Sequence, residues 1–235
     1  MSANDEHDLA RLAAIGDPFA DDAAAPVRSL EPPRIPAGEN ASPTRSRVRA
    51  IRWIAFAAAL LFEVPHLVFA RHRRDVTAVA PAELAVGLGL PLAVAAVAFF
   101  AGTRRGARGL GLPARVIAGL AVAAPALFAL GTLAGAPDNA PDPAFWQHAA
   151  GCASTTAVLA LGPVALGLWA FRRAFAVAAP WRTAALGIAA GGIAAAVMSI
   201  ACPITGAWHV LLGHGTMMLA AGLAGALLAP AVSRS

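Results

Sequence analysis

Residues 183–202 read TAALGIAAGGIAAAVMSIAC, an unbroken run of twenty residues without a charged side chain. A helix needs about 20 mostly apolar residues to cross the roughly 30 Å of hydrocarbon in a bilayer. This run therefore predicts a transmembrane helix. Five further apolar runs of similar length predict five more spans, at residues 51–70, 82–101, 115–135, 149–171 and 207–229.

The composition of the whole chain also favours a membrane protein. Of its 235 residues, 58% are hydrophobic and 13% are charged, which is about half the charged fraction of a typical soluble domain. The mean hydropathy is +0.66, and two cysteines are too few for a disulfide scaffold. We therefore expect an all-α, polytopic membrane protein, a bundle of six transmembrane helices in the lipid bilayer.

The sequence divides into three expected parts. Residues 1–49 hold eight of the thirteen acidic residues and a proline-rich polar stretch, a composition typical of a mostly disordered tail. Within it, residues 5–15 have apolar side chains at helical spacing and predict a short amphipathic helix. Residues 50–230 form the expected transmembrane domain, and residues 231–235 form a short C-terminal tail.

The arginines predict how the chain is oriented. All eighteen basic residues are arginine, and loops on the cytoplasmic side of a membrane carry an excess of basic residues. With the N-terminal tail in the cytoplasm, only Arg71, Arg73 and Arg74 fall on the outer side. We therefore predict a bacterial inner-membrane protein with both termini in the cytoplasm. The arginines flank apolar runs instead of forming a basic face, so we expect no direct contact with nucleic acid.

Polar groups inside the apolar spans are the candidate functional residues, because ionisable side chains are costly in a bilayer. In the predicted topology these groups share the outer half of the bundle: Glu63, His66, Glu83, His148, Cys152, Cys202, His209 and His214. All of them except Glu83 are candidate ligands of a soft metal ion such as zinc, copper or cadmium, since thiol and imidazole groups suit such ions.

Three interpretations of these groups stay open. Cys152 and Cys202 lie at matching depth on different helices and suit a redox pair in the oxidising periplasm. A metal site would use the same thiols together with imidazole or carboxylate groups. A purely structural role, in hydrogen bonds between helices, is the third. The spacing alone does not predict a zinc site, because His209 and His214 are five residues apart, about 140° around an α-helix.

The chain has no Walker loop and no HExxH motif, and its glycine-rich runs lie within apolar spans instead of at a strand-to-helix turn. We therefore expect no enzymatic activity. A bundle that binds two haems needs paired histidines at two depths, whereas the histidines of this chain fall at one depth in the predicted topology.

Residues 151–228 carry a series of short motifs: Gly151-Cys152, a span with a central Pro163, Phe171-Arg172-Arg173, Pro180, a Gly/Ala-rich span, Cys202-Pro203, Trp208, and a last span with Gly222 and Gly225. In these motifs the stretch resembles the NrsF family, whose members are six-span membrane anti-sigma factors that hold an extracytoplasmic-function (ECF) sigma factor inactive.

The resemblance implies a function. Cys152 and Cys202 match the two cysteines that the family places at the outer ends of its fourth and fifth spans. They would therefore sense oxidative or thiol-reactive metal stress and cause release of the sigma factor. The chain departs from the family pattern in its last span, where Trp208 is followed by His209 instead of a tyrosine. The added histidines favour metal coordination over a plain disulfide switch.

The N-terminal tail is the expected docking segment for the sigma factor. Its candidate contact residues are apolar: Leu9, Leu12, Ile15 and Phe19. A solvated leader with no partner is the alternative for this segment. The alternative for the whole chain is a membrane protein that binds or transports metal ions, or binds haem, through the His, Glu and Cys residues of its outer half.

Overall fold

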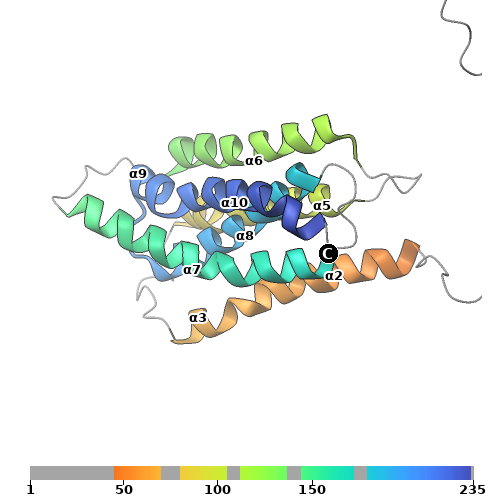
Figure 1. The fold of residues 1–235 in the computed structure, drawn as a ribbon. Coiled ribbons are helices and arrows are strands. Elements are labelled where there is room, and N and C mark those ends of the chain that lie inside the picture. The colour runs from red at the N-terminus through yellow and green to blue at the C-terminus, as the bar shows by residue number, and fades with distance from the viewer. Residues whose placement is uncertain (1–44, 70–79, 105–111, 137–143, 172–178, 234–235) are drawn as a thin grey trace, which may run out of the picture. The chain divides into compact units, whose positions relative to one another are not determined.

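The computed structural model describes residues 45–69, 80–104, 112–136, 144–171 and 179–233, and every element among them is helical (Figure 1). All of these residues belong to the unit Thr44–Ser235. The expected tail helix at residues 5–15 and the candidate docking residues of the tail lie outside the described residues.

The prediction of six membrane-crossing helices is confirmed within the part of the chain that the structure describes. Helices long and apolar enough to cross a membrane run over Arg49–Leu67, Pro81–Thr103, Ala114–Gly135, Phe145–Phe171, Ala179–Ala201 and Ala207–Ala231. Each end lies within four residues of the expected bound. The chain is therefore a multi-pass membrane protein.

The helical elements are named here in chain order. They are α2 (Arg45–Phe62), α3 (Val64–Phe69), α4 (Pro81–Leu84), η3 (Ala85–Gly89), α5 (Leu90–Thr103), α6 (Ala114–Gly135), α7 (Phe145–Phe171), α8 (Ala179–Ala201), α9 (Ala207–His209), η5 (Val210–Gly215) and α10 (Thr216–Ser233). The elements η3 and η5 are π-helices. Helix α2 begins at Arg45, so residues 45–49, at the end of the expected tail, are helical. Likewise, α10 continues three residues past the expected end of the domain.

Helix α8 forms the centre of the bundle. It packs against α5, α6, α7 and α10 (Figure 1), and 83% of its span is buried, against 11–39% for the other five. Its sequence is mostly alanine and glycine, so neighbouring helices approach its backbone on all sides. Lipid tails are as apolar as the helices, so helix association in a bilayer depends on such close packing.

Glycines make the contact between α8 and α10 possible. A Cβ atom added at Gly191 would lie 2.6 Å from the Cα atom of Met218, closer than real Cβ atoms come to a backbone atom. A Cβ atom at Gly187 would meet the carbonyl group of Ala221 in the same way. Gly222 and Gly225 on α10 allow the same approach from the other side. The glycines of the last two spans therefore lie on the faces where α8 and α10 contact one another.

Each of the first four spans contains a proline, at Pro65, Pro91, Pro125 and Pro163, and two of the four spans depart from α-helix near it. The first span breaks at Glu63, two residues before Pro65. The second contains the π-helix η3, which ends at Gly89, two residues before Pro91. Proline lacks a backbone N–H and leaves a carbonyl group of the preceding turn unbonded, which favours these irregular turns. By contrast, α6 and α7 continue as α-helix through Pro125 and Pro163.

The exposed tryptophans mark the two ends of the bundle. All five tryptophans of the chain are exposed. Trp146 and Trp208 lie where α7 and the last span begin, which we call the cysteine end of the bundle. Trp53, Trp169 and Trp181 lie near the opposite end. Tryptophan is enriched at both membrane–water interfaces, so this arrangement is the one expected of a bundle crossing the bilayer.

Arg182, near the start of α8, has a structural role that its place in the sequence did not reveal. Its side chain is 3% exposed, and its Nη1 donates to the carbonyl oxygens of Gly102 (2.8 Å) and Arg104 (3.2 Å). These carbonyls belong to the C-terminal end of α5, where a cation is favoured by the helix dipole and by the unbonded carbonyl groups. Arg182 therefore ties α5 to α8 at the end of the bundle opposite the cysteines.

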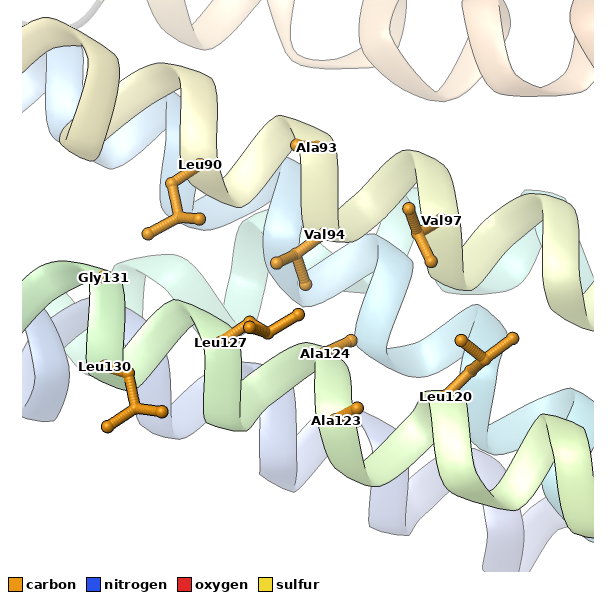
Figure 2. Close-up of a pocket in the computed structure, with 10 residues that line it drawn as sticks. All are labelled: Leu90, Ala93, Val94, Val97, Leu120, Ala123, Ala124, Leu127, Leu130 and Gly131. Atoms are coloured by element: carbon orange, nitrogen blue, oxygen red, sulfur yellow. The ribbon is translucent and has the colours of Figure 1, made fainter.

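A groove of about 380 Å³ runs between α5 and α6 (Figure 2). Its lining consists of leucine, valine, alanine and glycine residues only, among them Leu90, Val97 and Leu127. It holds no group that could act as a ligand, acid or base, so the candidate chemistry of this protein lies elsewhere.

The close contact of α8 with α10 gives a first prediction. Replacing Gly191 with alanine would force a methyl group against the α10 backbone, and overpacking of this kind costs about 1–3 kcal/mol. The detergent-purified variant should therefore unfold at a lower temperature than the parent protein, as followed by circular dichroism.

Gly119→Ala on α6 is the matched control, because nothing lies within 4 Å of a Cβ atom added there. It should leave the melting temperature unchanged or raise it slightly, since alanine favours helix over glycine. Equal melting temperatures for Gly191→Ala and Gly119→Ala would contradict the close α8–α10 contact.

Candidate functional site

Cys202 lies directly after α8, at the cysteine end of the bundle. Its backbone N–H donates to the carbonyl oxygen of Met198 at 2.7 Å and completes the last turn of the helix. Pro203 follows, and proline disfavours helical geometry at the residue before it and cannot itself donate a helical hydrogen bond. The chain therefore leaves the helix at Cys202, whose side chain is 5% exposed.

Cys152 reaches Cys202 from α7. It lies seven residues, about 10 Å of helix, after Phe145, the first residue of α7. Its Sγ atom is 3.5 Å from the Sγ atom of Cys202, and both cysteines are free thiols. The two cysteines that the sequence placed at matching depth are therefore in contact in the structure.

His209 and His214 join the cysteines because of the π-helix η5. The backbone N–H of Thr216 donates to the carbonyl oxygen of Leu211, a bond across five residues that is characteristic of a π-helix. This wider turn brings residues five apart onto one side of the helix. The rings of His209 and His214 are 5.5 Å apart between centroids, in an edge-to-face arrangement. The expected separation of about 140° around an α-helix was wrong, because the backbone here is not α-helical.

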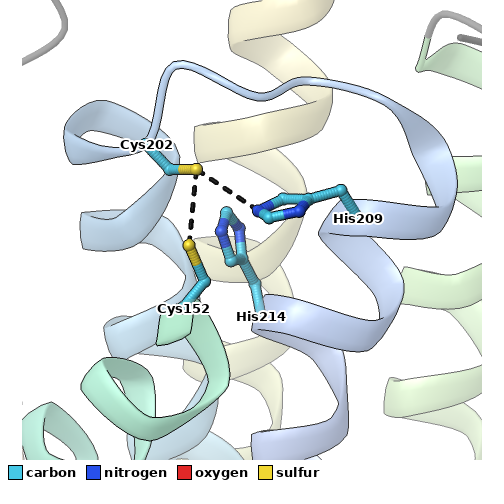
Figure 3. A group of neighbouring side chains, drawn as sticks. All are labelled: Cys152, Cys202, His209 and His214. Atoms are coloured by element: carbon cyan, nitrogen blue, oxygen red, sulfur yellow. Dashed lines mark hydrogen bonds between the residues drawn. The ribbon is translucent and has the colours of Figure 1, made fainter. Parts of the chain in front are cut away.

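Together these residues form what we call the thiol–imidazole cluster: Cys152, Cys202, His209 and His214. One ligand atom from each lies within 4.8 Å of the others, and the close-up shows both imidazole rings beside the two sulfur atoms (Figure 3). The Nε2 atom of His209 is 3.3 Å from the Sγ atom of Cys202. The cluster draws on α7, the link after α8, α9 and η5, so three of the six spans supply its ligands.

The imidazoles of the cluster are buried without enough partners. His209 and His214 are 2% and 1% exposed. Among the residues that the structure describes, neither ring nitrogen of His214 has a hydrogen-bond partner, and neither does Nδ1 of His209. A buried polar group left unsatisfied costs about 1–3 kcal/mol. Packing in the apolar bundle therefore does not account for these two histidines.

Two further residues position the cluster, and the sequence analysis missed both. A Cβ atom added at Gly213 would lie 3.2 Å from the Cβ atom of Cys152 and 3.4 Å from Nε2 of His209. The glycine therefore lets η5 approach α7 closely. The hydroxyl group of Thr156 donates to the carbonyl oxygens of Cys152 (2.7 Å) and Gly213 (3.3 Å). The available signals were the position of Thr156, one turn after Cys152, and the Gly-His-Gly run around His214.

The other predicted ligands do not belong to this cluster. Glu63 is 1% exposed at the break between α2 and α3, and its carboxylate oxygens have no hydrogen-bond partner among the described residues. His66 is half-buried on α3, and His148 is exposed one turn before Cys152 on α7. Of the seven candidate ligands, the structure brings four together and leaves Glu63, His66 and His148 apart from them.

The geometry of the cluster allows two kinds of chemistry. The first is oxidation, since a disulfide needs the two sulfur atoms at about 2.05 Å and the two thiols already touch. The second is coordination, because two thiolates and two imidazoles are a common ligand set for a tetrahedral metal ion. Both reactions use the same sulfur atoms and therefore exclude one another.

The comparisons with known proteins give one family. A family model described as "Negative regulator of sigma F", NrsF, matches residues 37–234. The matched region includes all six membrane-crossing helices. No curated protein and no solved structure gave a match.

The contact between the two thiols gives a second prediction. A mild thiol oxidant such as diamide should take two electrons and two protons from Cys152 and Cys202 and leave a disulfide within one chain. Differential alkylation followed by mass spectrometry of the detergent-purified protein measures the product.

The chain has only these two cysteines, so Cys152→Ser and Cys202→Ser are direct controls in which no bond within the chain can form. If oxidation of the parent protein joined only separate chains, or left both thiols reduced, the observed contact would be contradicted.

Proposed function

The chain belongs to the NrsF family and is a negative regulator of a sigma factor, and we propose that this partner is of the extracytoplasmic-function class. In the proposal, the protein lies in the bacterial inner membrane, binds the sigma factor on the cytoplasmic side, and releases it when Cys152 and Cys202 react near the periplasmic face. The family match supports a sigma factor as the partner. The contact between the thiols of Cys152 and Cys202 supports their reaction as the trigger for release.

The distribution of charge supports the proposed orientation. The described arginines Arg104, Arg115 and Arg182 belong to helix ends opposite the cysteines, and basic residues favour the cytoplasmic side. The cluster would then face the periplasm, which is an oxidising compartment. A stress acting outside the cell would meet the thiols before it met any cytoplasmic component.

Helix α8 is the proposed relay between the two sides. Its C-terminal end carries Cys202, and its N-terminal end carries Arg182, which holds the end of α5. Close contact with α10 through Gly187 and Gly191 would couple any shift of α8 to its neighbour. Packed helices of this kind respond by small shifts between discrete arrangements. A reaction at the cluster would therefore displace α8 as a unit and alter the cytoplasmic end of the bundle.

The N-terminal tail is the proposed docking segment on the cytoplasmic side. Its apolar residues Leu9, Leu12, Ile15 and Phe19 would cover a surface of the sigma factor that RNA polymerase otherwise uses. A stimulus can shift this equilibrium only by its difference in affinity for the two states. A hundredfold release requires about 2.7 kcal/mol, and one disulfide typically contributes about 2–4 kcal/mol. The proposed trigger is therefore large enough.

The proposal predicts the capture of a sigma factor by the membrane protein. Full-length protein in native membranes or detergent should retain an ECF sigma factor of the same organism, and replacing Leu9, Leu12 and Phe19 with alanine should weaken retention at least about tenfold, because the apolar contacts are lost. Quantitative co-purification measures the retained fraction. If the full-length protein retained no sigma factor, the proposed function would be wrong.

The same assay tests the trigger. Oxidation with diamide should lower retention in the parent protein and leave it unchanged in the Cys152→Ser/Cys202→Ser protein. Gln147→Ala, an exposed change near the start of α7, is the control and should respond like the parent. Equal loss of the sigma factor from the parent and the double-serine protein would remove the cysteines from the mechanism.

A further inference from the structure

We infer that Cys152, Cys202, His209 and His214 bind one divalent cation of the zinc or cadmium type, in four-coordinate geometry. The family resemblance concerns the two cysteines alone. The two histidines and the π-helix that presents them make the site a complete ligand set. The binding site stands on the geometry described here, whereas its role in releasing the sigma factor rests on the proposed function.

The distances between ligand atoms fit a tetrahedral ion. Zinc–sulfur bonds of about 2.3 Å and zinc–nitrogen bonds of about 2.0–2.1 Å place two sulfur ligands about 3.8 Å apart, and a sulfur and a nitrogen ligand about 3.6 Å apart. The observed separations are 3.5 Å between the two sulfur atoms and 3.3 Å between Cys202 Sγ and His209 Nε2. The other ligand atoms lie within 4.8 Å of one another, so shifts on the order of 1 Å or less would bring all four to coordination distance.

The burial of His214 is an independent observation that points to a ligand. The imidazole is 1% exposed, it lies beside both sulfur atoms (Figure 3), and both of its nitrogens lack a partner among the described residues. A hydrogen-bonded structural histidine would have at least one partner. A cation bound by one ring nitrogen would supply the missing interaction. Lipid tails and apolar side chains cannot supply it, because they offer no hydrogen bond.

The ligand chemistry selects the class of cation. No carboxylate belongs to the cluster among the described residues, whereas calcium and magnesium require oxygen ligands. Two sulfur and two nitrogen ligands in tetrahedral arrangement favour zinc and related soft ions. The charges also balance: the two thiols release two protons to water as they bind, and two thiolates with a divalent cation form a neutral complex. A neutral complex is the form that an apolar interior tolerates best.

Binding would tie three spans together at the cysteine end. Cys152 comes from α7, Cys202 from the end of α8, and the two histidines from the start of the last span. A two-electron thiol oxidant, such as a peroxide or a diazene like diamide, would accept two electrons from the two thiolates and leave them joined as a disulfide. Two of the four ligands would then be lost, and the cation would be released to the solvent. The cluster would thus change between a metal-linked state and a disulfide-linked state, and each state would place α8 differently against α7.

The test is metal binding by the full-length, detergent-purified protein after reduction and removal of metal with a chelator. Titration with Co²⁺, whose visible absorption is intense when it is tetrahedral and bound by thiolate, should saturate at one ion per chain, and Zn²⁺ should displace it. His209→Ala and His214→Ala should each lower the affinity at least about tenfold, because each removes a ligand. Losing only a residue that supports a ligand already costs 10–100-fold.

His148→Ala is the matched control, since this exposed histidine of α7 lies outside the cluster and its loss should leave the affinity unchanged. Zn²⁺ should also slow alkylation of Cys152 and Cys202 in the parent protein, a measurement that does not depend on the folding of any variant. Saturation at less than one ion per chain without zinc protection of the thiols would overturn the inference. Equal affinities of His214→Ala and His148→Ala would overturn it as well. Neither assay contains a sigma factor, so failure of the metal site and failure of the proposed function are distinguishable.

Discussion

The hydrocarbon of a bilayer offers no hydrogen bond, and every polar side chain in this bundle has to find its partner inside the protein. Most of those described do so locally. Thr183 and Thr216 donate to carbonyl oxygens one turn earlier in their own helices, and Arg182 caps the end of α5. His209 and His214 do not follow this pattern, since three of their four ring nitrogens lack a partner within the described residues. Glu63 and Thr132 are buried without such a partner as well, but only the two histidines lie beside other ligand groups among the described residues. The polar groups of the spans thus include a satisfied structural set and this second set, the two histidines of the thiol–imidazole cluster.

The position of that second set follows from the packing of α8. Glycines bring α8 and α10 into backbone contact, and the link between Ala201 and Ala207 is short. It turns at once after Cys202 and returns the chain into the last span, where the π-helix presents His209 and His214 to the sulfur atoms. The same helix carries Arg182 at its other end. One continuous helix therefore joins the thiol–imidazole cluster to the opposite end of the bundle, which is the connection that the proposed regulation uses.

The number and limits of the spans were predictable from the sequence, because length and apolar composition are local signals that tertiary contacts barely alter. The central place of α8 was not, although its alanine and glycine content indicated close packing. The two cysteines were singled out by their matching depth and by the family resemblance. The joining of His209 to His214 was missed because the spacing argument assumed α-helical geometry, and nothing in the local sequence states that residues 210–215 form a π-helix. Arg182 was assigned to topology alone, since its carbonyl partners lie about eighty residues away in α5.

The central claim is that four side chains from three spans act as one ligand set. X-ray absorption spectroscopy at the zinc edge of the zinc-loaded, full-length protein tests it most directly. The account predicts a first shell of two sulfur atoms at about 2.3 Å and two nitrogen atoms at about 2.0–2.1 Å. A shell of oxygen and nitrogen atoms without sulfur, or one with a single sulfur atom, would contradict it.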